Sequence, residues 1–191
     1  FNEWELKGVP LRIEVGPNEV DDEVATLVHR PDGEQLETDR SQLVGAVEEN
    51  LEDVHEKLAA TYETGLEATG HFASRETGAS LDAFIAAGIT SCHEGVRKEE
   101  TLARLRKGMW TMLRQGSAWK DVPETIKAVT ETDVDTRHLL LVSDDTHPDT
   151  ITEEGHLDRV LRVAIRNGLD PVTAIQAVTI NAAEYYGVDN D

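Results

Sequence analysis

The chain has 191 residues, enough for one medium domain or two small ones, and 39% of them are hydrophobic, which is enough to build a core. It carries 38 acidic against 18 basic residues, a formal net charge of -20 that argues against generic nucleic-acid binding, because such binding needs a basic face. The single cysteine, Cys92, excludes a disulfide frame and a cysteine-based zinc finger, and no run of apolar residues is long enough to predict a membrane span.

The first part of the chain has the pattern of two strands and a helix. Residues 9–16 and 24–29 predict strands, and a turn signal follows at residues 31–33. Residues 39–62 predict a helix, because its apolar residues recur at spacings of three and four: Leu43, Val47, Leu51, Val54 and Leu58. We therefore expect a first unit over residues 1–62, a small α/β fragment of strand, strand and helix.

After a break at residues 64–70 the pattern changes to short strands alternating with helices. Strands are predicted at 89–92 and 138–143, and helices at 78–88, 97–116, 121–131, 153–168 and 171–186. This alternation is typical of a parallel α/β sheet or barrel, so we expect a second α/β unit over residues 68–191.

Three polar residues stand where strands are expected to end. His71 follows residues 68–70, His93 follows 89–92, and Asp144 follows 139–143. In a β/α barrel, catalytic side chains lie at the C-terminal ends of the strands, and two imidazoles with a carboxylate suit a divalent metal ion. From spacing alone a histidine after a strand is more often structural, and His29, His55, His138 and His156 are interpreted in that way. His147 lies where it can line the mouth of a pocket, and Cys92 reads as a small buried filler.

Three longer stretches carry a resemblance to a known family. Residues 70–94, 98–121 and 139–188 resemble the adenine deaminase branch of the amidohydrolase superfamily, over about 120 of the 191 residues. The motifs that match in order and spacing are Gly70-His71, Ser91-Cys92-His93-Glu94, Arg114-Gln115-Gly116-Ser117, Ser143-Asp144-Asp145 and Thr179-Ile180-Asn181.

This resemblance implies that residues 68–191 are the C-terminal half of a metal-dependent (β/α) hydrolase barrel. It implies His71, His93 and Asp144 as metal ligands, with Asp144 also shuttling a proton and Glu94 relaying one to the substrate. The loop from Arg114 to Ser117 would lie near the purine, with Ser117 and Asp145 as substrate-binding residues. The implied reaction is hydrolysis of adenine to hypoxanthine and ammonia with manganese or iron. Cys92 departs from the family, where many relatives have aspartate.

The resemblance also shows what the 191 residues lack. The family takes further ligands from a His-x-His motif and from a bridging carboxylate on an earlier strand, and no His-x-His occurs in this sequence. A complete barrel needs roughly 250 residues, so a second polypeptide supplying the missing half-barrel is an expected partner. We therefore expect a truncated deaminase that is inactive as an isolated chain.

The opening residues carry a second resemblance. Residues 1–17 and 27–33 resemble the anticodon-binding domain of archaeal-type prolyl-tRNA synthetase, a match that extends to about residue 60. The alternative function is therefore a tRNA-binding module with a non-functional deaminase tail, and a third is a non-catalytic product that interacts through exposed sheet edges. Only under the alternative is tRNA a partner; otherwise the expected ligand is adenine.

The acidic residues are spread along the whole chain, a surface typical of a salt-loving host. The first residues show neither an initiating methionine nor a signal-peptide pattern, so we expect an internal piece of a longer, cytoplasmic protein without a membrane partner.

Overall fold

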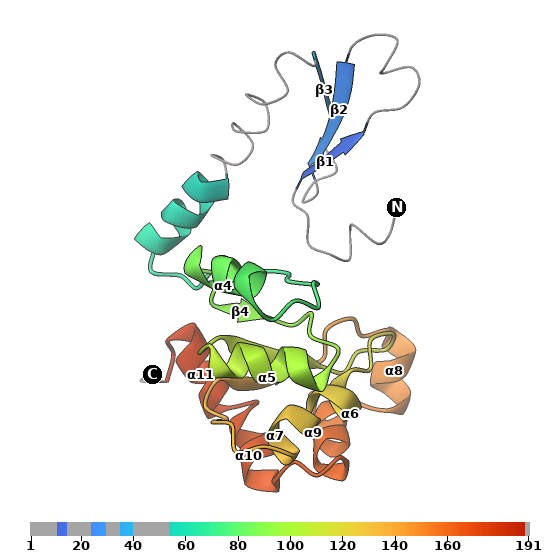
Figure 1. Cartoon of the computed structure of the whole chain (residues 1–191). Coiled ribbons are helices and arrows are strands. Elements are labelled where there is room, and N and C mark those ends of the chain that lie inside the picture. Colours follow the sequence, from blue (N-terminus) through green and yellow to red (C-terminus); the bar gives the residue numbers. More distant parts are fainter. Residues whose placement is uncertain (1–10, 15–23, 30–34, 40–53, 190–191) are drawn as a thin grey trace. The chain divides into compact units, whose positions relative to one another are not determined.

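A computed structural model of the chain describes residues 11–14, 24–29, 35–39 and 54–189, and of the three segments before residue 54 it describes the backbone alone. The chain divides into two compact units, Phe1–Gly65 and Leu66–Asp191 (Figure 1). The assignment of residues 1–62 and 68–191 to two domain types stays a prediction.

The first unit contains a small antiparallel sheet. Its strands are β1 (Leu11–Glu14), β2 (Val24–His29) and β3 (Gln35–Asp39), hydrogen-bonded in the order β1-β2-β3. The predicted pattern of two strands was incomplete: β3 has one strongly apolar residue among polar ones, so its sequence gives no alternating signal. A helix spans residues 54–63, and the earlier part of the predicted helix, residues 40–53, lies outside the described residues.

The second unit is built on a parallel sheet. The strands β4 (Ser91–Cys92), β5 (Trp110–Arg114) and β6 (Leu139–Val142) are paired in the order β4-β5-β6. A further segment joins the outer edge of β4, where Thr69 bridges to Ser91 in parallel. The α/β class is therefore confirmed, and a partial barrel remains a proposal.

The strand β5 replaces the second half of a predicted helix at 97–116. The helix α5 covers only Lys98–Arg106, and Gly108 follows in a left-handed conformation with φ of 77°. Glycine adopts this conformation without a steric penalty, so it ends the helix and turns the chain into β5. The prediction was wrong because the apolar residues of β5 continue the helical spacing of α5 by chance.

The remaining predicted helices are shorter than expected, and two of them, at 121–131 and 171–186, are each two helices. The helices of this unit besides α5 are α4 (Ala79–Ala86), α6 (Val122–Thr125), α7 (Lys127–Thr130), α8 (Pro148–Glu153), α9 (Leu157–Arg166), α10 (Pro171–Gln176) and α11 (Ile180–Tyr186). Both α8 and α10 begin at a proline, whose fixed φ suits the first position of a helix.

The main core lies between the sheet and the helices that follow it. Leu113, Leu139 and Leu141 project from β5 and β6 and pack against Val160 and Ala164 of α9. All five are at most 3% exposed. Burying a leucine or valine side chain to this extent contributes about 1.5–3 kcal/mol of hydrophobic transfer energy.

The last helix of this unit, α11, is bonded to this sheet through a side chain. The Nδ2 group of Asn181 in α11 donates to the carbonyl oxygens of Thr136 and Leu139, at 3.0 and 2.8 Å. The motif around Asn181 therefore has a structural role, which holds α11 against β6.

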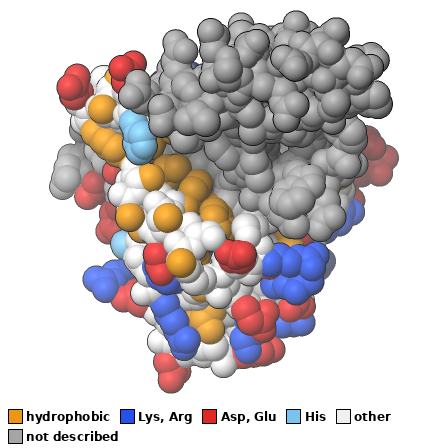
Figure 2. All heavy atoms as spheres, turned by 45° about the horizontal axis from the view of Figure 1, so that its top comes forward, with side chains coloured by type: hydrophobic (Ala, Val, Ile, Leu, Met, Phe, Trp, Pro, Cys, Tyr) orange, Lys and Arg blue, Asp and Glu red, His pale blue; other side chains and the backbone are white. Residues whose placement is uncertain are grey.

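Within the described residues, no helix combines the length and apolar character that crossing a membrane requires. On the face that Figure 2 shows, acidic, basic and hydrophobic side chains are interspersed over the described part of the surface.

Candidate functional site

The parallel sheet places four polar side chains at one edge. His71 follows the segment that bridges to β4, His93 follows β4, Arg114 is the last residue of β5, and Asp144 comes two residues after β6. Because the strands are parallel, their C-terminal ends meet on the same side of the sheet. The position predicted for His71, His93 and Asp144 from strand ends is thus the position they occupy in the fold.

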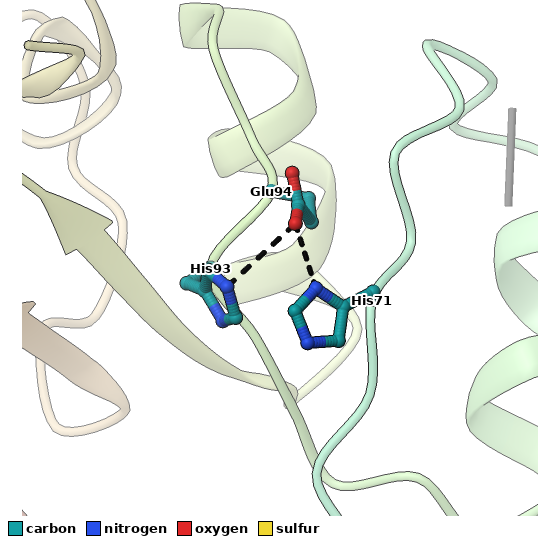
Figure 3. Close-up of side chains that lie close together, drawn as sticks. All are labelled: His71, His93 and Glu94. Atoms are coloured by element: carbon teal, nitrogen blue, oxygen red, sulfur yellow. Dashed lines mark hydrogen bonds and ion pairs between the residues drawn. The ribbon is translucent and has the colours of Figure 1, made fainter. Parts of the chain in front are cut away.

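Two histidines and a glutamate form a tight group at this edge. Glu94 lies between the two imidazoles (Figure 3): its Oε1 is 2.7 Å from His71 Nδ1 and 3.6 Å from His93 Nε2. The two rings meet edge to face with their centroids 4.5 Å apart. Among the described residues, these three are the group whose ligand atoms lie within 4.8 Å of one another.

The surroundings of this group fix its charge states. Burial alone would raise the pKa of Glu94, but the hydrogen bond from His71 and the charge of Arg114 outweigh it and lower the pKa. Glu94 is therefore a carboxylate at neutral pH, and because a carboxylate only accepts hydrogen bonds, His71 donates to it from Nδ1. Burial, and after it the neighbouring His71, lower the pKa of His93, which favours the neutral imidazole that a metal ion requires.

Arg114 connects this group to a second carboxylate. Its Nη1 donates to Glu94 Oε2 and to Asp144 Oδ2, both at 3.2 Å, and its Nε donates to Asp121 Oδ2 at 2.8 Å. Burial alone would lower the pKa of Arg114, but the bond to Asp121 and the charge of Glu94 raise it, so the side chain stays cationic. The ring of Trp119 lies over the guanidinium, 4.9 Å from its centre. Sequence analysis placed Arg114 only near the purine; its bridging role depended on the strand β5 that was not predicted.

Asp144 stands beside the three-residue group without being a member of it. Its carboxylate reaches the group through Arg114, and 27% of its side chain is exposed. Its backbone φ is 58°, and among the described residues Asp144 is the non-glycine residue with a positive φ. Aspartate tolerates this left-handed conformation better than most residues, but at a cost in energy.

The two predicted substrate-binding residues lie in a pair of loops that hold each other. Ser117 N donates to the carbonyl oxygen of Asp145 at 2.7 Å, and the Asp145 carboxylate accepts from Ala118 N at 2.8 Å. The Ser117 hydroxyl donates to Thr150 Oγ1 and accepts from the amide of His147. Both side chains thus organise the loops after β5 and β6, and contact with a purine stays a prediction.

A buried arginine bonds to the loop that follows β5. Arg159 of α9 is 4% exposed and donates to the carbonyl oxygens of Gln115 and Gly116 at 2.6 and 3.2 Å. No sequence motif singled it out, because an arginine in an amphipathic helix reads as a surface residue.

The structural interpretation of His138 agrees with its contacts. Its Nδ1 donates to the carbonyl oxygen of Gly108 at 2.9 Å, and its ring stacks on Trp110. Cys92 is fully buried, as a filler would be, but its sulfur also accepts backbone hydrogen bonds.

The donor set fits a divalent transition metal. His71 and His93 provide two imidazole nitrogens, and Glu94 provides a carboxylate oxygen within 4.8 Å of them. Nitrogen and oxygen donors of this kind suit zinc, iron and manganese. Asp144, the third predicted ligand, lies across Arg114 from Glu94, so the side chains that the fold gathers most closely are those of His71, His93 and Glu94. Metal binding by His71, His93 and Asp144 stays a prediction.

The chain is similar to proteins named adenine deaminase. It is 55% identical over 138 residues to adenine deaminase of Moorella thermoacetica, 49% over 140 residues to that of Rubrobacter xylanophilus, and 45% over 142 residues to that of Clostridium botulinum (strain ATCC 19397 / Type A). These matches cover 72–74% of this chain but 23–24% of the relatives, so the chain spans about a quarter of their length.

Residues 1–50 match a different family, described as "Anticodon binding domain". Both resemblances read from the motifs are thereby confirmed: most of the chain resembles adenine deaminase, and its first residues resemble an anticodon-binding domain.

Proposed function

We propose that the chain is part of an adenine deaminase-like, metal-dependent hydrolase, which converts adenine and water to hypoxanthine and ammonia. The observation that carries the proposal is the group formed by His71, His93 and Glu94 at the C-terminal ends of parallel strands. Its support is the identity of 45–55% to proteins named adenine deaminase.

We propose that His71 and His93 hold the metal through imidazole nitrogens, with manganese or iron as the preferred ion. Glu94 is the carboxylate whose oxygen lies within 4.8 Å of donor nitrogens of both histidines, and Asp144 is joined to Glu94 through Arg114. A bound divalent metal lowers the pKa of water and so makes hydrolysis feasible near neutral pH. The exposed His71, with 61% of its side chain accessible, leaves this site open to solvent and substrate.

Proton transfer falls to the two carboxylates that Arg114 joins. Asp144 accepts a proton from the attacking water, since its carboxylate is 27% exposed and is oriented by a fixed cation. Glu94 accepts a hydrogen bond from His71, and its lowered pKa keeps it an ionised carboxylate at neutral pH. In this proposal Glu94 relays to the purine a proton that comes from the attacking water. The loops that contain Ser117 and Asp145 would contact the base.

We further propose that this chain does not complete the reaction alone. The sequence supplies two clustered histidines and no His-x-His, and its parallel sheet of β4, β5 and β6 does not close on itself. A polypeptide that continues this sheet as a barrel would bring the remaining ligands, because the ends of added parallel strands meet at the same edge.

The test is metal binding and ammonia release in molar salt, which screens the repulsion within a chain of net charge -20. We expect the chain to bind Mn²⁺ and His71→Ala to weaken that binding, while His138→Ala, whose ring stacks on Trp110 away from the site, leaves it unchanged. Ammonia release from adenine should need the polypeptide that supplies the rest of the barrel. No Mn²⁺ binding by the chain would refute the proposal.

A second candidate rests on the first residues of the chain. The match of residues 1–50 to an anticodon-binding domain favours recognition of tRNA by this segment. The acidic excess argues against it, because each phosphate contact needs a cation. Salt-dependent binding of tRNA by the chain, in the absence of Mn²⁺ binding, would favour this candidate over the hydrolase.

A further inference from the structure

Two loops bring the metal-site side chains together, and neither loop is part of a helix or strand. The first contains His71 and Phe72, and the second contains His93, Glu94 and Gly95. Side chains on loops are held in place only if their backbone groups are bonded to something rigid. The backbone partners of these two loops are three buried side chains, of Cys92, Glu100 and Arg104.

The Cys92 sulfur lies between the two loops and bonds to both. It accepts the amide of Phe72, which follows His71, at 3.3 Å, and the amide of Glu94 at 3.4 Å. Cys92 is fully buried, so its sulfur is not accessible to water. A side chain that filled space without accepting hydrogen bonds would leave the buried amide of Phe72 and the partly buried amide of Glu94 without this acceptor.

Two side chains of the helix α5 also bond to these two loops. Arg104 donates from Nη2 to the carbonyl oxygen of Phe72 at 2.8 Å, and Glu100, one turn earlier, accepts the amide of Val96 at 2.9 Å. Arg104 is 1% and Glu100 4% exposed. Charged side chains are almost never buried to this extent without a specific role, because their desolvation is costly.

Gly95 is what allows the guanidinium to lie so close to the second loop. A Cβ atom at this position would lie 2.7 Å from Arg104 Nη1, closer than such contacts occur. The approach of Arg104 to both loops therefore depends on the absence of a side chain at residue 95.

We propose that Cys92, Glu100 and Arg104 are positioning residues, which fix the loop carrying His71 relative to the loop carrying His93 and Glu94. The metal site named in this role rests on the proposed function; the hydrogen bonds that define the role do not. Partners that orient metal ligands typically change metal affinity by about 10- to 100-fold when they are removed.

The experiment combines amide hydrogen exchange with Mn²⁺ titration on the whole chain. In metal-free Cys92→Ala we expect the amides of Phe72 and Glu94 to exchange about five- to tenfold faster, because each loses its acceptor. In the same variant the Mn²⁺ affinity should fall about tenfold, and Cys92→Ser, which keeps an acceptor, should recover part of both.

Arg104→Met tests the same role from α5 and should also lower the Mn²⁺ affinity. Arg106→Met is its matched control, since Arg106 is exposed on the same helix. Leu81→Val controls for packing, because Leu81 shares the core cluster of Cys92 and Phe72 and has no polar group to bond the loops. Both controls should bind Mn²⁺ as the unmodified chain does.

The proposal is overturned if the amides of Phe72 and Glu94 stay protected in Cys92→Ala, or if Leu81→Val lowers the affinity as much as Cys92→Ala does. An unmodified chain that binds no Mn²⁺ would overturn the proposed function, and the exchange rates would still decide the positioning role. If Cys92→Ala does not fold, the amide exchange rates and the Mn²⁺ affinities of Cys92→Ser and Arg104→Lys are compared in its place.

Discussion

Arg114 offers the sharpest test of how the site is held together, because one cation serves three carboxylates. Its side chain is 6% exposed, and it bonds to Asp121 at 2.8 Å and to Glu94 and Asp144 at 3.2 Å. Replacing it by methionine keeps an unbranched apolar stem and removes the charge, so the three carboxylates lose their common partner and repel one another.

The expected loss follows from the burial of these groups. Removing one partner of a fully buried ion pair costs about 3–5 kcal/mol. The carboxylates here keep 17–27% of their side-chain area in water, which reduces the cost. We therefore expect Arg114→Met to lower the free energy of unfolding by about 2–3 kcal/mol.

The measurement is urea-induced unfolding of the metal-free chain at constant ionic strength. Arg137→Met is the matched control: Arg137 pairs with Asp135 at the surface and is 82% exposed, so its loss should lower the free energy of unfolding much less than the loss of Arg114. A double-mutant cycle with Asp121→Asn should give a coupling of about 1 kcal/mol or more between Arg114 and Asp121. The reasoning is refuted if Arg114→Met costs no more than Arg137→Met.

Three further predictions address the core, a buried hydroxyl and a surface ion pair. Leu139→Ala should lower the free energy of unfolding by about 2–5 kcal/mol, because Leu139 is fully buried between the sheet and the helices; a midpoint shift in urea smaller than that of an exposed control, Ile151→Ala, would contradict this. Tyr185→Phe should cost about 1 kcal/mol in the same assay, since the phenol of Tyr185 is 2.8 Å from the Ser91 hydroxyl, which keeps Thr69 as a second partner. Asp158→Asn tests pH dependence: the bond from Arg162 lowers the pKa of Asp158 below its ordinary 3.8, so the carboxylate stabilises the fold above that value and the contribution is lost as the pH falls through the lowered pKa. The difference in melting temperature between Asp158→Asn and the unmodified chain should therefore be present at pH 7 and shrink below pH 3.8; a difference that stays constant would count against the ion pair.

The positions of His71, His93 and Asp144 could be predicted from the sequence because a parallel α/β pattern forces polar residues after the strands to one edge. This prediction needs only the order of the strands and helices, so the wrong prediction of a helix at 97–116 did not affect it. It could not identify the contacts of Arg114, because the apolar residues of β5 imitate the spacing of a helix until Gly108 is seen in its left-handed conformation.

Which of Glu94 and Asp144 lies closer to the two histidines could not be read from the sequence. Both follow strands, and both are carboxylates. What separates them is a backbone angle and an arginine: the chain turns to positive φ at Asp144, and Arg114 lies between its carboxylate and that of Glu94. Such details depend on three-dimensional packing that no spacing rule records.

The positive φ of Asp144 has a consequence for how this chain would respond to selection for stability. A non-glycine residue in this conformation costs about 1 kcal/mol or more, whereas glycine occupies it freely. Asp144→Gly would relieve this strain, but it would also remove one of the three carboxylates that share Arg114. The backbone conformation and the ion pair with Arg114 therefore act in opposite directions on the stability of the fold at residue 144.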